Sequence, residues 1–76
     1  MTSHLVLMEV IFTKHALLRI KKRKITKEEI VVSIKSPDKT YKRKGKFYVQ
    51  KNIGRANIEI IYEKDKYIRI ITLYYL

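Results

Sequence analysis

The sequence predicts an α+β fold in which two N-terminal helices pack on a four-stranded, mainly antiparallel sheet. Before Pro37, apolar residues recur at helical spacing and follow two helix-capping signals. After Pro37, runs rich in Ile, Val, Tyr and Phe are separated by turn residues, as strands are. Upstream of the helices, Leu5–Phe12 predicts a short extra N-terminal strand, and we expect Met1–His4 to be disordered. At this length the chain forms one domain, residues 1–76.

The first helix is predicted over Thr13–Lys24. Thr13 is a good N-cap, because its hydroxyl can accept a hydrogen bond from an orphan N–H of the first turn. Leu17 and Ile20, with Ala16, form an apolar stripe that we expect to be buried.

The second helix has a well-defined start and end. Thr26, with Glu29 three residues later, forms a capping box, and Ile25 and Ile30 occupy the positions of a hydrophobic staple. Ser36-Pro37 ends the helix, because the residue before a proline is pushed out of the α region. We therefore interpret Glu29 as part of a cap rather than as a catalytic carboxylate.

Four strands are predicted after Pro37, the first two joined by a Lys44-Gly45 turn: Lys39–Arg43, Lys46–Asn52, Arg55–Tyr62 and Tyr67–Tyr75. Regular alternation along the last strand places Arg69 on the same side as Ile71 and Leu73. An arginine among apolar neighbours is unusual on a central strand. Arg69 is therefore expected either to pair with Glu59 or to line a site.

Charge is the strongest global feature of the sequence. There are 18 Lys and Arg residues against seven Asp and Glu, which gives a formal net charge of +11. Two segments without any acid, Lys14–Lys27 and Lys39–Arg55, each contain seven of these cations. Self-repulsion at this density favours a nucleic acid or an acidic protein as partner. The alternative is a solvated, lysine-rich surface.

Composition also limits the chemistry. The chain has no cysteine and two histidines, so we expect no metal site and no cofactor. The apolar run Leu5–Val10 is too short to span a membrane and has no basic leader before it. We therefore expect no membrane association and a cytoplasmic location.

One face of the first helix carries groups that suit chemistry on phosphate. His15, Arg19 and Arg23 are four residues apart in turn and stack on one side of a helix. An imidazole can move a proton near neutral pH, and guanidiniums can hold a phosphate. Metal-free RNA cleavage needs a base, an acid and cations at the phosphorane, for which His15, Arg19 and Arg55 are candidates. The alternative is that His15 is a surface or structural residue.

The hairpin after Pro37 mixes aromatic and basic residues, as a surface for single-stranded nucleic acid does. The alternative is that Phe47 and Val49 face the core while the lysines are solvated at a sheet edge. The predicted nucleic-acid-binding residues in the whole chain are Arg23, Lys42, Arg43, Lys44, Lys46, Tyr48, Lys51 and Arg69.

Several short motifs together resemble a widespread, largely uncharacterised family of small prokaryotic domains. They are a His-Ala-x-x-Arg helix at His15, the segment Ile25-Thr-x-Glu-Glu-Ile, Ser36-Pro-Asp and the basic hairpin. That family is similar to toxins of the RelE and BrnT type. The resemblance implies a compact, metal-independent ribonuclease that is often inhibited by an antitoxin. It also implies that His15 and Arg19 are motif residues, and that Tyr74 or Tyr75 stands where a C-terminal catalytic tyrosine is expected.

The first hypothesis from the sequence is therefore a metal-independent endoribonuclease of the RelE/BrnT type, with His15, Arg19, Arg55 and Tyr74 at its site and RNA as partner. The alternatives are a non-catalytic nucleic-acid-binding module and a basic interaction protein for an acidic, antitoxin-like partner. The apolar run Tyr67–Leu76 is a candidate homodimer edge.

Overall fold

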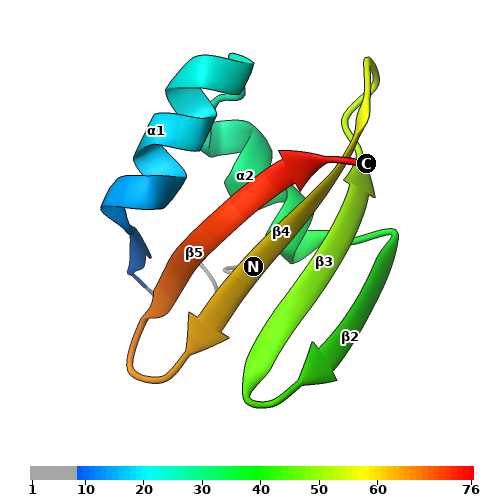
Figure 1. Ribbon diagram of the computed structural model, residues 1–76. Coiled ribbons are helices and arrows are strands. Elements are labelled where there is room, and N and C mark those ends of the chain that lie inside the picture. The colour runs from blue at the N-terminus through cyan, green and yellow to red at the C-terminus, as the bar shows by residue number, and fades with distance from the viewer. Residues whose placement is uncertain (1–8) are drawn as a thin grey trace, which may run out of the picture.

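The structure is a computed structural model that describes residues 9–76, and it contains the predicted order of elements (Figure 1). These elements are β1 (Val10–Phe12), α1 (Lys14–Arg23), α2 (Lys27–Lys35), β2 (Lys39–Arg43), β3 (Lys46–Asn52), β4 (Asn57–Lys64) and β5 (Ile68–Tyr75). Two predictions lie outside the described residues: the disorder of Met1–His4, and the first four residues of the strand predicted over Leu5–Phe12.

The strands form one mixed, five-stranded sheet in the order β1-β5-β4-β3-β2. The four C-terminal strands are antiparallel, as predicted, and each pairs with the next along the chain. β1 adds the fifth strand and runs parallel to β5. Both helices lie behind the sheet in Figure 1, so one sheet face is covered and the other faces the viewer.

Both predicted helix starts are confirmed. The Thr13 hydroxyl accepts a hydrogen bond from the N–H of Ala16 at 3.1 Å. Thr26 and Glu29 form a reciprocal capping box, with both bonds at 3.0 Å. α2 ends at Lys35, with Ser36 as its C-cap immediately before the proline.

The core lies between the helices and the covered face of the sheet. Its largest contribution comes from isoleucines of β4 and β5, which pack against Ile30 of α2 and Ala16 of α1. The expected burial of Leu17 is wrong, because the residue is 41% exposed. The buried stripe of α1 is narrow: Ala16 is fully buried, Ile20 packs against the core, and Leu17 and Leu18 face outward.

A β-bulge in β5 corrects the predicted alternation of the last strand. Thr72 lies opposite Ile61 and Ile70 lies opposite Tyr62, so Ile71 is an extra residue. The extra residue shifts the alternation, and Leu73 therefore returns to the covered face that Ile70 occupies. Regular alternation predicted Arg69 and Leu73 on the same side of the sheet. This prediction is wrong, because the bulge places them on opposite sides.

Thr13 binds both carbonyls at this bulge. Its N–H donates to the carbonyl of Ile70 at 3.0 Å, and its hydroxyl donates to the carbonyl of Ile71 at 2.8 Å. The same hydroxyl caps α1, so one side chain joins the start of the helix to the point where β5 changes its alternation.

Thr13→Ala should lower the free energy of unfolding by about 1–2 kcal/mol, because the cap and the hydroxyl bond to the bulge are both lost. Thr13→Ser retains the hydroxyl and should stay within about 0.5 kcal/mol of wild type. Urea unfolding followed by circular dichroism measures both variants. Equal losses for alanine and serine would show that the hydroxyl does not have this role.

Candidate functional site

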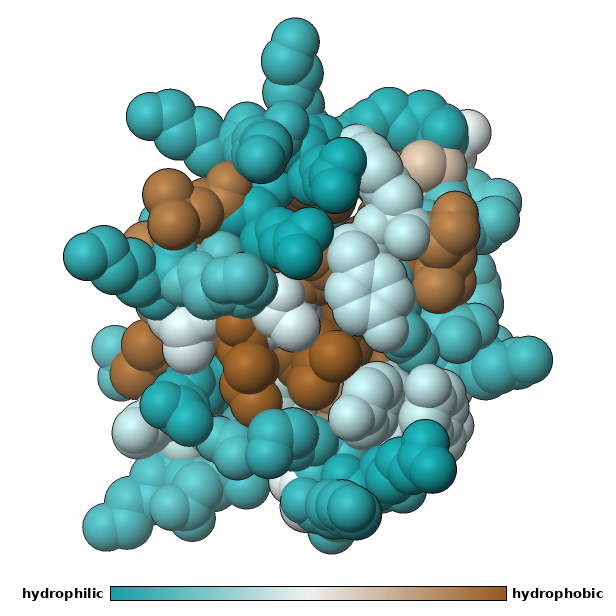
Figure 2. All heavy atoms as spheres, viewed as in Figure 1, coloured by the Kyte–Doolittle hydropathy of each residue, from teal (hydrophilic) through white to brown (hydrophobic). Residues whose placement is uncertain are grey.

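The uncovered face of the sheet, which we call the open face, carries three cross-strand rows of side chains. Residues directly opposite each other on neighbouring strands share a face, so the register assigns these rows. The rows are Lys39–Gln50–Glu59–Tyr74, then Tyr41–Tyr48–Ile61–Thr72, then Arg43–Lys46–Glu63–Arg69, in which an ion pair joins Lys46 to Glu63. In Figure 2, pale and brown residues fill the middle of this face, and hydrophilic residues surround them.

Five of the residues predicted from the sequence meet on this face: Arg43, Lys46, Tyr48, Arg69 and Tyr74. The first three also line one hollow at the end of the hairpin, together with Lys44 of the turn.

Two other predicted nucleic-acid-binding residues lie on the covered side. Lys42 is opposite Phe47, and its amine lies 5.2 Å from the centre of that ring. Lys51 is opposite the buried Ile58 and pairs with Asp38 at 3.5 Å.

The third row contains a carboxylate between two cations. Glu63 accepts a hydrogen bond from Arg69 at 2.7 Å, and the amine of Lys46 lies 3.7 Å from its other oxygen. The Arg69 guanidinium is the main cause that holds the pKa of Glu63 below its ordinary value. The expected pairing of Arg69 with Glu59 is therefore wrong, because the two residues belong to different rows.

Glu59 is instead bonded by neutral donors within the first row. Its carboxylate accepts hydrogen bonds from the hydroxyls of Tyr41 and Tyr74 and from the Gln50 amide. The bond to Glu59 raises the pKa of Tyr74 to about 12. A phenol with this pKa is a weak proton donor at neutral pH. Gln50 could not be identified as a partner of Glu59 from the sequence, because the row that the two residues share requires the strand register.

The predicted basic face of α1 is present. His15, Leu18, Arg19, Lys22 and Arg23 line one hollow on the outer side of the helix. His15 is exposed, and Leu18 is 62% exposed. We call these five residues the α1 face.

Arg55 is held at the joint between the two helices, away from the α1 face hollow. Its guanidinium bonds to the Glu29 carboxylate and donates to the carbonyl of Lys24 at 2.9 Å. Tyr75 binds the preceding carbonyl, that of Arg23, at 2.7 Å. Arg55, in the loop between β3 and β4, and Tyr75 of β5 therefore both hold the end of α1.

The four residues predicted as catalytic thus occupy three places. His15 and Arg19 share the α1 face, and Arg55 is bonded at the helix joint. Tyr74 lies on the open face, whereas α1 packs against the other side of β5.

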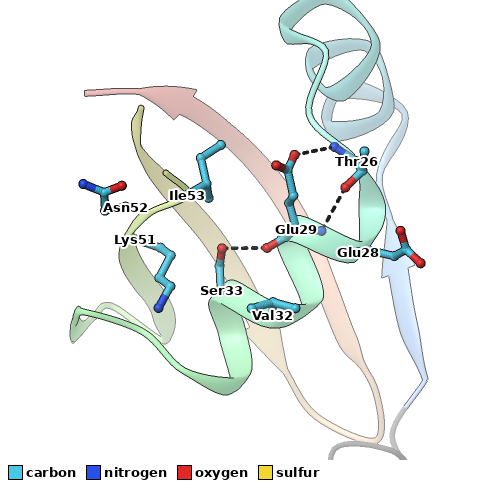
Figure 3. Close-up of a pocket in the computed structure, with 8 residues that line it drawn as sticks. All are labelled: Thr26, Glu28, Glu29, Val32, Ser33, Lys51, Asn52 and Ile53. Atoms are coloured by element: carbon cyan, nitrogen blue, oxygen red, sulfur yellow. Dashed lines mark hydrogen bonds between the residues drawn. The ribbon is translucent and has the colours of Figure 1, made fainter. Parts of the chain in front are cut away.

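A further hollow is a groove beside α2 (Figure 3). Most of its polar groups already have partners: Glu29 bonds to Thr26, and the Ser33 hydroxyl donates to the carbonyl of Glu29 at 2.7 Å. Val32 and Ile53 supply its apolar wall. The predicted structural role of Glu29 is confirmed here.

Comparison with known proteins gives one family. Residues 12–75 match the model of a domain of unknown function, DUF4258. Because the match covers most of the chain, the protein belongs to this uncharacterised family. No curated protein and no solved structure gives a significant match. Neither helix within residues 9–76 is long and apolar enough to cross a bilayer.

Arg55→Ala should destabilise the protein at pH 7 and do so less at pH 3. The Arg55 hydrogen bond is the main cause that lowers the pKa of Glu29 below its ordinary 4.5, so this stabilisation exists above that value. It is lost as Glu29 is protonated, whereas the bond to the Lys24 carbonyl persists. Urea midpoints at the two pH values measure the change.

Lys64→Ala is the matched control, because it removes one exposed charge that pairs with no carboxylate in the described part of the chain. An Arg55→Ala deficit that is equal at both pH values would contradict the role of the ion pair.

Proposed function

We propose that this protein binds single-stranded RNA on the open face of its sheet. The observation that carries the proposal is the arrangement of that face. Tyr41, Tyr48 and Tyr74 lie on it with Ile61, and Lys39, Arg43, Lys46 and Arg69 lie along its outer two rows. Aromatic rings stack on unpaired bases while cations neutralise phosphates, so this arrangement suits a single strand better than a duplex.

The charge balance supports the same proposal. Among the described residues, which include all 18 Lys and Arg, only Lys46, Lys51, Arg55 and Arg69 pair with a carboxylate. The remaining cations, including those of the α1 face, are available to a polyanion. Neutralising phosphates and releasing their counterions would give the binding a steep salt dependence.

A metal-independent endoribonuclease of the RelE/BrnT type is the second candidate function. It is favoured by the α1 face, where His15 lies in one hollow with Arg19 and Arg23. An imidazole beside two guanidiniums supplies one proton carrier and cations for a phosphate. DUF4258 is a family of unknown function, so this candidate rests on the α1 face.

Lys39, Arg43 and Lys44 pair with no carboxylate in the described part of the chain, so replacing these three together with alanine should weaken the binding of a labelled single-stranded RNA. Each lost phosphate contact reduces the slope of log K against log salt by about 0.7, so the triple variant should lose about 2 from the slope. Fluorescence anisotropy measured between about 50 and 200 mM salt gives both the affinity and its salt slope. Duplex DNA and single-stranded DNA are measured in parallel.

The control replaces Lys35, Lys64 and Lys66 with alanine, because this change removes the same charge from positions outside the three rows. Equal weakening by both triple variants would contradict a site on the open face. Absence of binding to any nucleic acid would favour an acidic protein partner instead.

The same RNA samples, kept in EDTA and run on a denaturing gel, test the second candidate. Cleavage that His15→Ala reduces by roughly 10²- to 10⁴-fold would support chemistry at the α1 face. Intact RNA at every protein concentration would contradict the endoribonuclease and leave RNA binding as the only one of the two candidate functions.

A further inference from the structure

The open face contains a buried carboxylate with no cationic partner among residues 9–76. Glu59 is only 4% exposed, although it lies on the side of the sheet that no described helix covers. Its Oε2 atom accepts from the Tyr41 hydroxyl at 3.0 Å and from the Gln50 amide at 3.2 Å. Its Oε1 atom accepts from the Tyr74 hydroxyl. Three neutral donors therefore replace the water that Glu59 loses.

These bonds keep the group ionised. Burial raises the pKa of Glu59, but the hydrogen bonds from Tyr74, Gln50 and Tyr41 together outweigh it, and the pKa lies below its ordinary value. An ionised acceptor binds hydroxyls more strongly than a neutral one does. The hydroxyls of Tyr41 and Tyr74 are thus committed to Glu59.

The bond to Glu59 fixes one end of the Tyr41 ring, and Tyr48 fixes one of its faces. The two rings are stacked, with centroids 4.9 Å apart and planes 3° from parallel. Tyr41 lies on β2, the edge strand of the sheet, and no further strand of the described chain covers its other side. The residue remains 43% exposed, so a fixed ring is presented to solvent.

We propose that Tyr41 stacks an unpaired base of the bound RNA and that Glu59 is the positioning residue that holds the ring for it. This inference rests on the proposed single-stranded RNA binding. Lys39 and Arg43 lie two residues to either side of Tyr41 on the same face, where they meet the phosphates flanking the stacked base.

The arrangement also sets the specificity. The Tyr41 hydroxyl is used by Glu59, so the ring contributes its π face and not a hydrogen bond to a base edge. Every base has a π face, and such stacking tolerates any sequence. Fixing the ring before binding lowers the entropy cost of ordering it in the complex.

The test measures the affinity of labelled oligo-A, oligo-U and oligo-C RNA for wild type and four variants by fluorescence anisotropy. Tyr41→Ala removes the ring and should weaken binding of all three RNAs by about 5- to 150-fold, the range that one stacked base represents. Tyr41→Phe keeps the ring and loses its fixed end, so it should weaken binding less. Val32→Ala, an exposed change on α2, is the control and should bind like wild type.

Glu59→Gln tests the positioning role, because it keeps the shape and removes the charge that commits the hydroxyls. It should weaken binding about as much as Tyr41→Phe, and the double variant should be no weaker than either single one. NMR of ring-labelled tyrosine should show the pKa of Tyr74 fall from about 12 towards 10 in Glu59→Gln. Circular dichroism checks that each variant is folded.

The outcomes separate the two proposals. No RNA binding by wild type would overturn the proposed function itself. Binding by wild type that Tyr41→Ala leaves unchanged, or a preference above about 100-fold for one base, would overturn the stacking site alone. A fall in the pKa of Tyr74 without loss of affinity in Glu59→Gln would overturn the positioning role. If Glu59→Gln does not fold, Tyr41→Phe decides: affinity equal to wild type overturns that role.

Discussion

Two short helices can cover only one face of a five-stranded sheet, and the rest of this structure depends on that constraint. Burial of the isoleucines of β4 and β5 under α1 and α2 provides the main hydrophobic stabilisation, because this face carries nearly all of the fully buried apolar side chains. The opposite face must then be compatible with water while still filling its surface with large side chains. Tyrosines, an amide and paired or hydrogen-bonded carboxylates meet this requirement, since each combines apolar area with a polar tip.

The local parts of the fold could be predicted because their causes are local. The capping box of Thr26 and Glu29, the stop before Pro37 and the Lys44-Gly45 turn depend on residues a few positions apart, and all three are present. The bulge at Ile71 could not be predicted in the same way. Thr13, which is remote in sequence, binds the two carbonyls at the bulge, and nothing in the pattern Ile70-Ile71-Thr72 marks an extra residue. One inserted residue reverses the side of every later residue, which is why the predicted position of Leu73 relative to Arg69 was wrong.

The candidate sites show the same division between local and non-local causes. The grouping of His15, Arg19 and Arg23 follows from helical spacing alone, and the structure brings them together. The open face requires the register of four strands, so only separate members were identified from the sequence, such as Tyr48 from the hairpin pattern and Arg69 from the alternation of the last strand. The Glu59 network was missed because its three donors come from three different strands. Arg55 has a bonded partner in Glu29, 26 positions away, which charge counting along the sequence cannot detect. Comparison with known proteins adds the family, and the family is itself uncharacterised.

The measurement that tests the central claim most directly is an amide NMR titration of the full chain with single-stranded oligo-U RNA. Binding on the open face predicts that the largest shifts fall on β2 and β3 and at Arg69 and Tyr74, with small shifts at Val32 on the outer side of α2. Line broadening that follows the same rows would support the same surface. Shifts confined to α1, with the rows of the open face unchanged, would contradict the account and place the strand on the helix instead.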